Sequence, residues 1–210
     1  PEATTCFGDN FGNFCQEPIL VDNRIEWRPA ASQSLDTDIL TTPKTPFSTN
    51  GGVKLLEGNL GRCVIKTSAV NASHHVVEAP AVVINDQDDL RPLFDAGELN
   101  RDCVVVVRFQ GPAANGMPEL HKLTPMLGVL QDRGFKVALV TDGRMSGASG
   151  KVPAAIHLVP EASHGGLLAQ LQTGDVIRLD ATTGVLSALI DATDLEHRAV
   201  SVAPAARGTV

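Results

Sequence analysis

The chain has 210 residues, 43% hydrophobic and 20% charged, the composition of an ordinary folded protein with room for one large domain and an appendage. Its formal net charge of −7 argues against a nucleic-acid partner, because proteins that bind nucleic acids generally present a basic surface. No apolar run approaches the roughly 20 residues that a membrane-spanning helix needs, so no membrane partner is expected.

The N-terminus and the cysteines favour a cytoplasmic protein. The opening residues PEATTCFGDN lack the basic segment and apolar core of a signal peptide, and the start at Pro1 leads us to expect a processed chain or a piece of a longer protein. No two of the four cysteines have the C-x-x-C spacing of a local zinc or redox motif. Cys63 and Cys103 lie in or beside apolar runs and are expected to be buried thiols, whereas Cys6 and Cys15 could be metal ligands. This cysteine usage suits a reducing compartment.

The first part of the chain differs in composition from the rest. Residues 1–52 are rich in Asn, Asp, Thr, Pro and Gly, and only 18–21 and 25–27 resemble short strands. Residues 41–52 (TTPKTPFSTNGG) are typical of an irregular connector. We therefore predict a boundary near Gly52, between an irregular N-terminal extension and a domain formed by residues 53–210.

Strand-like runs dominate the second part. Runs rich in Val, Ile and Leu alternate with Gly, Asp and Asn turns. The predicted strands are 53–56, 63–68, 76–84, 103–109, 136–140, 176–180 and 185–190. The last two strands are joined by a hairpin turn, DATTG.

Three helices are predicted between these strands. The first covers 89–96 and a short one covers 118–123. In the third, Thr124 can cap the N-terminus, Pro125 suits the first turn and Gly134 can end the helix. Its apolar face is formed by Met126, Leu127 and Leu130. Many strands with few helices predict an α/β fold, a mixed sheet or barrel flanked by helices.

The stretch TDGRMSGASGKVP (141–153) directly follows a predicted buried strand. The carboxyl edge of a sheet is a common ligand site, and glycines let backbone N–H groups approach an anion closely. Arg144 and Lys151 add positive charge, and Ser146 or Ser149 would face the ligand. The composition favours a carboxylate or phosphate site, while a merely flexible glycine–serine loop stays open as an alternative.

Two well-defined sequence motifs do not fit this stretch. A phosphate-binding P-loop needs G-x-x-x-x-G-K-[ST], but Met145 replaces its first glycine and Val152 its final hydroxyl residue. A hydrolase nucleophile elbow needs G-x-S-x-G, and neither Ser146 nor Ser149 has both glycines.

A second polar stretch, RFQGPAANGMPELH (108–121), also leaves a strand and is predicted to open a helix. In the first helical turn, the Glu119 carboxylate would complement the helix dipole. Alternatively, Glu119 is a ligand for Mg²⁺, which usually takes one or two carboxylates together with water and substrate oxygens.

Both stretches closely resemble the C-terminal half of the dihydroxy-acid and sugar-acid dehydratase family, which shares a D-G-R-x-S-G loop and a G-P-x-x-x-G-M-x-E loop. The supporting matches are GGVKLLEGNLGRCVIKTSAV, VVEAPAVV and GDVIRLDATTGVL, and the resemblance covers about residues 15–195. The forms NGMPELHKLTP and SGASGKVPAAIH point to the branch that acts on 6-phosphogluconate.

The resemblance implies a chemistry and a set of site residues. The family removes water from a sugar acid to give a 2-keto-3-deoxy acid, with an iron–sulfur cluster (4Fe-4S) and Mg²⁺ as Lewis acids. The matching serine, Ser146, would be the catalytic base that takes the C2 proton, and Glu119 would be a Mg²⁺ ligand. The substrate contacts would come from Arg144, Gly147, Ser149 and Lys151.

The resemblance also implies a fold and partners. The fold would be a barrel-like swivelling β/β/α domain that docks on an N-terminal catalytic domain, in an enzyme that is usually a homodimer. Residues 1–52 would be the tail of that catalytic domain. The family's cluster cysteines lie in the N-terminal domain, and Cys6 and Cys15 match none of its motifs. We therefore expect the cluster ligands outside this chain and no catalysis by this chain alone.

Three alternatives stay open on the sequence alone. The chain could be a binding module that holds a phosphorylated sugar acid without chemistry, or part of a dehydratase for a related sugar acid. A serine hydrolase using Ser146 with a histidine is the third.

Overall fold

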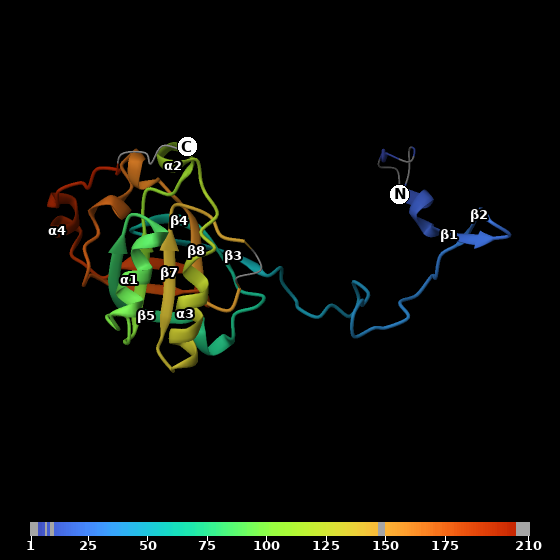
Figure 1. The fold of residues 1–210 in the computed structure, drawn as a ribbon, viewed down its shortest axis with the longest axis horizontal. Helices are drawn as coiled ribbons and strands as arrows, with labels where there is room; N and C mark the ends of the chain where they lie inside the picture. Colours follow the sequence, from blue (N-terminus) through green and yellow to red (C-terminus); the bar gives the residue numbers. More distant parts are fainter. Residues whose placement is uncertain (1–3, 7, 9–10, 147–149, 205–210) are drawn as a thin grey trace. The chain divides into compact units, whose positions relative to one another are not determined.

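The computed structural model describes residues 4–6, 8, 11–146 and 150–204. The chain divides into two compact units, Pro1–Asn50 and Gly51–Val210 (Figure 1). The sequence placed the boundary two residues later. The assignment of residues 1–52 to the tail of a catalytic domain stays a prediction.

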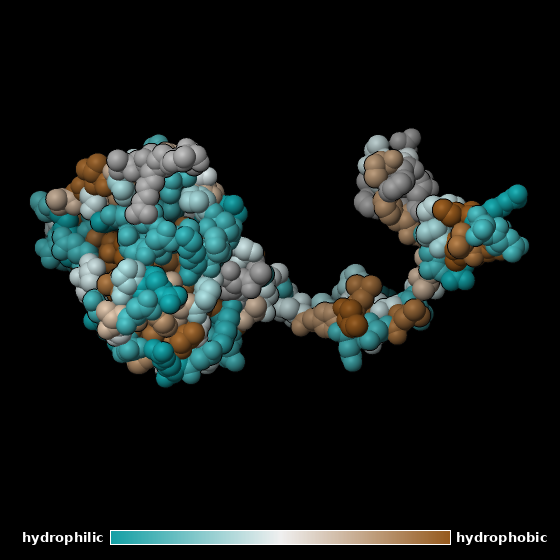
Figure 2. All heavy atoms as spheres, viewed as in Figure 1, coloured by the Kyte–Doolittle hydropathy of each residue, from teal (hydrophilic) through white to brown (hydrophobic). Residues whose placement is uncertain are grey.

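The first unit contains a short 3-10 helix, η1 (Phe11–Cys15), and a hairpin of β1 (Gln16–Val21) and β2 (Arg24–Pro29). The strands pair antiparallel across Asp22 and Asn23, whose φ angles of 46° and 61° are the left-handed pair of a type I′ turn. The exposed apolar side chains of this unit contribute brown surface to Figure 2. A hairpin without buried residues is marginally stable on its own, so this unit needs a surface to pack against.

The second unit is a closed eight-stranded barrel with the strand order β10-β3-β4-β8-β7-β6-β5-β9. Strands β5, β6, β7 and β8 run parallel to one another, and the barrel also contains antiparallel pairs. The strands are β3 (Val53–Gly58), β4 (Gly61–Lys66), β5 (Val76–Ile84), β6 (Cys103–Val107), β7 (Val137–Thr141), β8 (Ala154–Val159), β9 (Val176–Asp180) and β10 (Val185–Ala188). The predicted mixed α/β barrel with a few helices is confirmed. Strand β8 was missed, because a polar His157 interrupts its short apolar run.

Short helices connect the strands. The α-helices are α1 (Leu90–Asp95), α2 (Pro112–Asn115), α3 (Leu123–Asp132) and α4 (Ala192–His197). The 3-10 helices of this unit are η2 (Ala72–His74), η3 (Gln87–Asp89), η5 (Ala162–His164) and η6 (Leu167–Gln170). None of the helices in the described ranges has the length and apolar character needed to cross a bilayer.

Two details of the helix prediction were wrong. No helix covers 118–122, because Glu119 forms an isolated β-bridge with Arg144 that holds the backbone at Glu119 out of a helical conformation. Helix α3 begins at Leu123 with Lys122 as its N-cap, and no side chain caps it, so Thr124 lies inside the helix. Its predicted apolar face is confirmed, because Met126, Leu127 and Leu130 are buried.

The hydrophobic core has two layers that share the central strands. Every residue of β6 is buried, because its side chains alternate between the two layers. Val104 and Val106 lie in the cluster that fills the barrel, whereas Cys103, Val105 and Val107 pack under α1 and α3. Figure 1 shows α1 and α3 on either side of β7, and residues of both helices pack in the layer outside the barrel.

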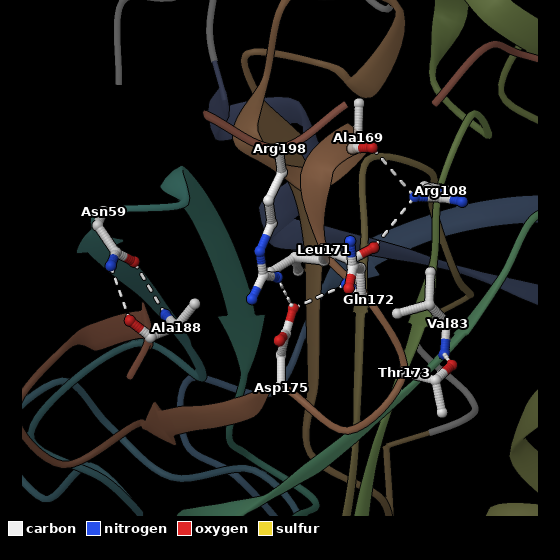
Figure 3. A network of polar contacts seen from close by, with 10 residues as sticks. All are labelled: Asn59, Val83, Arg108, Ala169, Leu171, Gln172, Thr173, Asp175, Ala188 and Arg198. Atoms are coloured by element: carbon white, nitrogen blue, oxygen red, sulfur yellow. Dashed lines mark hydrogen bonds and ion pairs between the residues drawn. The ribbon is translucent and has the colours of Figure 1, made fainter. Parts of the chain in front are cut away.

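Polar contacts fix the segments at one end of the barrel (Figure 3). Arg108 donates from Nη1 to the carbonyls of Ala169 and Leu171 at 3.1 and 3.2 Å. Arg198 forms a 2.5 Å ion pair with the largely buried Asp175, which joins the segment after α4 to the turn before β9. These contacts hold the η6 segment and the end of the described chain against the barrel.

Candidate functional site

Two loops leave the same edge of the barrel. Strands β6 and β7 pair in parallel, with Val107 opposite Thr141 at their carboxyl ends. The loops that follow, 108–122 and 142–153, therefore start side by side. They are the two polar stretches that the sequence singled out.

Asp142 joins three segments at this edge. Its side chain is 1% exposed and accepts hydrogen bonds from the backbone N–H groups of Phe109 (3.1 Å), Gln110 (2.8 Å) and Ala162 (3.0 Å). Burial raises the pKa of Asp142 above its ordinary value, although the three hydrogen bonds act in the opposite direction. No role was predicted for Asp142 from the sequence. Its position between the end of strand β7 and Gly143 was the signal that could have indicated one.

Gly143 permits the close contact of the two loops. A Cβ at this position would lie 2.7 Å from Gln110 Cβ and 3.1 Å from both Gln110 O and Leu120 Cδ1. The loops would have to separate to admit any side chain larger than hydrogen. A residue without a Cβ is therefore required here by packing.

Glu119, Arg144 and Ser146 meet where the loops touch. Arg144 Nη1 lies 2.6 Å from Glu119 Oε2, and the backbone N–H of Ser146 donates to Glu119 Oε1. Arg144 also donates from Nε to the carbonyl of Met117 at 3.0 Å. The Glu119 and Arg144 side chains are 27% and 46% exposed, so this contact lies at the surface of the barrel.

Strained backbone is concentrated around this contact. Among the described residues of the second unit, the non-glycine residues with positive φ are Phe109 (63°), Met117 (56°) and His157 (57°). Each has a backbone contact with the site: Phe109 N–H donates to Asp142, Met117 O accepts from Arg144, and His157 N–H donates to Gly143 O at 2.9 Å. Left-handed backbone at non-glycine residues is costly and tends to cluster at functional sites.

A cavity of about 260 Å³ lies beside Ser146. Lys66 of β4 and His157 of β8 also line it, with apolar walls that include Val64 and Ile156. No role was predicted for Lys66 or His157 from the sequence. No short motif could have placed them beside Ser146, since strand pairing brings them there.

The other predicted site residues have different positions. Lys151 forms a 2.5 Å ion pair with Asp132 of α3, and both side chains are exposed. Its ammonium group therefore faces helix α3. Gly147 and Ser149 lie outside the described residues.

The described residues suit a Mg²⁺ ion better than an iron–sulfur cluster, the two metal groups that the family resemblance implies. Glu119 offers one hard oxygen donor group, and each carboxylate oxygen retains a lone pair beyond its contact with Arg144 or Ser146, which fits one ligand of a Mg²⁺ ion. An iron–sulfur cluster requires thiolates. Burial raises the pKa of Cys63 to about 12 and that of Cys103 to about 11, and the two thiols lie in different layers of the core. No group of three or more His, Cys, Asp or Glu suited to a metal occurs in the described ranges. These residues therefore do not fit a cluster.

Comparison with known proteins supports a family assignment. Residues 38–210 match the family described as dihydroxy-acid/6-phosphogluconate dehydratase C-terminal. The chain is 58% identical over 203 residues to the phosphogluconate dehydratase of Pseudomonas aeruginosa, a match that covers 97% of this chain and 33% of the relative. It is 56% identical over 197 residues to the enzyme of the same name from Escherichia coli K12, covering 94% of this chain and 33% of the relative.

A more distant relative carries a different name. The dihydroxy-acid dehydratase of Wolinella succinogenes is 37% identical over 206 residues, which cover 97% of this chain and 34% of that protein. The chain thus spans about a third of the length of the curated relatives it matches. On the family match and these identities, the chain belongs to the dihydroxy-acid/6-phosphogluconate dehydratase C-terminal family.

Proposed function

We propose that this chain forms the C-terminal part of the active site of a phosphogluconate dehydratase. This hydro-lyase would convert 6-phospho-D-gluconate to 2-keto-3-deoxy-6-phosphogluconate, a step of the Entner–Doudoroff pathway of gluconate metabolism. The two phosphogluconate dehydratases described above are 58% and 56% identical, against 37% for the dihydroxy-acid dehydratase, which supports this substrate branch. The observation that carries the proposal is the contact of Ser146 and Arg144 with Glu119, since these three residues belong to the two loops that the family shares.

Ser146 is proposed as the base. Deprotonated, its Oγ would take the C2 proton, the 3-hydroxyl would leave as water with a proton from solvent, and the resulting enol would tautomerise to the 2-keto acid. A serine hydroxyl is a weak base unless nearby positive charge lowers its pKa. A Mg²⁺ ion bound to Glu119 would supply such charge beside the substrate's carboxylate end. Within this chain, Glu119 holds the Ser146 backbone in one position by accepting a hydrogen bond from its N–H.

The proposed substrate contacts differ in how the protein presents them. Arg144 is held by Glu119 and by the Met117 carbonyl, so its guanidinium is already oriented at the loop contact. Lys151 would have to leave Asp132 to reach the same ligand. Gly147 and Ser149 complete the set of proposed contacts on the strength of the family loop.

The proposed partner is the portion of the relatives that this chain does not span. That portion would carry the N-terminal catalytic domain with the cluster ligands and the other Mg²⁺ ligands. We propose a homodimer in the cytoplasm, as the family resemblance implies. The 210-residue chain by itself is then expected to show no turnover of 6-phosphogluconate.

A chimera tests the function directly. This chain would replace the matching C-terminal third of the Pseudomonas aeruginosa relative, and anaerobically purified protein would be assayed for dehydration of 6-phosphogluconate. In the chimera, Ser146→Ala should lower kcat by about 10²- to 10⁴-fold, the range for loss of a general base. KM should change little, because the hydroxyl acts mainly in the transition state.

Ser68→Ala is the matched control, because Ser68 is an exposed serine of the same unit that does not line the cavity. Its kcat should equal that of the parent chimera. Retained turnover in Ser146→Ala, with the folded state intact by circular dichroism, would reject Ser146 as the base. A chimera without activity in its parent form would count against the assigned reaction.

A further inference from the structure

The cavity beside Ser146 has a basic lining. Among the described residues that line it, the ionisable ones are Lys66 and His157, both basic. None of these described lining residues is acidic, and most of the remaining wall that they form is apolar. Lys66 is half-buried, so its positive charge lies where water is partly excluded. A charge in such a place interacts more strongly with an oxyanion than it would on an open surface.

Strand register places Lys66 on the outside of the barrel. On β4, Cys63 and Ile65 are buried in the barrel core, so the alternate residues Val64 and Lys66 face outward. Val64 pairs with Ile156 of β8, which also faces outward. The outward faces of β4 and β8 therefore form one wall of the cavity.

A bulge brings His157 to the same wall. Arg62 pairs with Val159, but Val64 pairs with Ile156, so β8 has one more residue than β4 over this interval. His157 has a φ of 57°, and the next residue, Leu158, returns to the barrel core. Ile156 and His157 are consequently consecutive outward residues, which regular strand alternation would forbid. The left-handed backbone thus re-aims His157 toward the cavity.

The His157 backbone is also hydrogen-bonded to the loop 142–153. Its N–H donates to the carbonyl of Gly143 at 2.9 Å. Gly143 in turn packs against Gln110 and Leu120 of the neighbouring loop. The position of the imidazole is therefore coupled to the two loops that hold Ser146 and Glu119.

We propose that Lys66 and His157 form an oxyanion-binding subsite for the substrate whose proton Ser146 takes. The ligand is a phosphate or carboxylate group of the sugar acid, bound by charge-assisted hydrogen bonds from the ammonium and imidazole N–H groups. The apolar wall shields the anion from water. Ser146 lines the same cavity. The identity of the substrate rests on the proposed function, but the presence of an oxyanion subsite does not.

The test is a titration of the ¹⁵N-labelled 210-residue chain, followed by amide chemical shifts. Three probes are added separately: 6-phosphogluconate, D-gluconate and inorganic phosphate. Saturable shifts at the amides of Ser146, Gly150 and His157 are expected with 6-phosphogluconate. Shifts of these amides with inorganic phosphate but not gluconate identify the phosphate as the bound group. Shifts with gluconate but not phosphate identify the carboxylate.

Two variants remove the basic groups with little change in shape. Lys66→Met keeps the apolar stem, and His157→Asn keeps a residue that tolerates left-handed backbone. Each should weaken binding of 6-phosphogluconate about tenfold or more, as expected for loss of a hydrogen bond to a charged group. Lys136→Met is the matched control, since Lys136 is exposed just before the amino end of β7, and it should bind as the unaltered chain does.

Two results would overturn the subsite. One is the absence of saturable shifts in the unaltered chain, and the other is unchanged affinity in Lys66→Met or His157→Asn with a native-like spectrum. This titration needs no turnover, so its outcome is separable from that of Ser146→Ala. Retained turnover in Ser146→Ala together with lost binding in Lys66→Met would reject the base and keep the oxyanion subsite.

Discussion

Ser146 donates its backbone N–H to the carboxylate of Glu119, which lies 27 residues earlier in the chain. The other oxygen of the same carboxylate lies 2.6 Å from Arg144 Nη1. One side chain thus fixes two residues of the opposite loop, and the isolated β-bridge between Glu119 and Arg144 aligns their backbones. The position of the proposed base depends on this contact.

Glu119→Gln should impair turnover more than stability. The amide retains one acceptor oxygen, so it cannot serve both Arg144 and the Ser146 N–H, and it is a poor Mg²⁺ ligand. In the chimera, kcat should fall about 10- to 100-fold. The free energy of unfolding should change by less than about 1 kcal/mol, because the ion pair is partly exposed. Turnover within twofold of the parent would contradict the positioning role.

Gly143→Ala should separate the two loops. The new methyl would lie 2.7 Å from Gln110 Cβ, and neither loop can move without disturbing Asp142. We expect a loss of about 1–3 kcal/mol in urea unfolding, the usual cost of overpacking. Gly128→Ala is the control: Gly128 lies within helix α3 with open space around it, so this change should stabilise the chain by about 0.5–1 kcal/mol. Equal effects at both positions would contradict the packing argument.

Asp142→Ala should be strongly destabilising. Three buried backbone N–H groups would lose their acceptor, at about 1–3 kcal/mol each, so a loss of about 3 kcal/mol or more is expected in urea unfolding. Asp132→Ala is the control, because Asp132 is exposed and forms a surface ion pair, and it should cost no more than about 1 kcal/mol. A small effect at Asp142 would mean that the three segments are held by other contacts.

The pH dependence of stability should also reveal the raised pKa of the Asp142 carboxyl group. Burial raises its pKa in the folded state above the ordinary value of 3.8, so the folded chain binds more protons than the unfolded chain between these two pKa values. Its contribution to stability therefore falls as pH rises from about 3.8 through the folded-state pKa. In Asp142→Asn this component is absent, so the stability of the unaltered chain relative to Asp142→Asn should decrease over that range. A constant difference between the two unfolding curves would contradict the raised pKa.

Thiol labelling should separate the cysteines into two classes. Cys63 and Cys103 are buried, with pKa values raised to about 12 and about 11, so neither forms thiolate at pH 8 in the folded chain. Cys6 and Cys15 are exposed. A disulfide reagent added to the native chain should therefore label Cys6 and Cys15 rapidly and the other two only after unfolding. Rapid native labelling at Cys63, identified by mass spectrometry, would show that the barrel opens readily.

The fold was largely predictable because its signals are local. The strand 76–84 and the strand 176–180 were predicted at their observed bounds, since β-branched runs bounded by turn residues define them. The helix over 118–123 was wrong, because the long-range bridge from Glu119 to Arg144 overrides the local pattern. Strand β8 was missed because the polar His157 interrupts its short apolar run, and the bulge that accommodates His157 exists only in pairing with β4.

The candidate site was predictable only in part. The sequence by itself determined the candidate residues of the two loops, Glu119, Arg144 and Ser146, because residue types and family motifs are written along the chain, and their chemical roles stay predictions. Tertiary structure alone decided that Glu119 contacts both other residues, that Lys151 faces helix α3, and that Lys66 and His157 share a cavity with Ser146. The physical reason is that parallel pairing of β6 and β7 sets the loops side by side, while register and a bulge in β4 and β8 choose which side chains face outward.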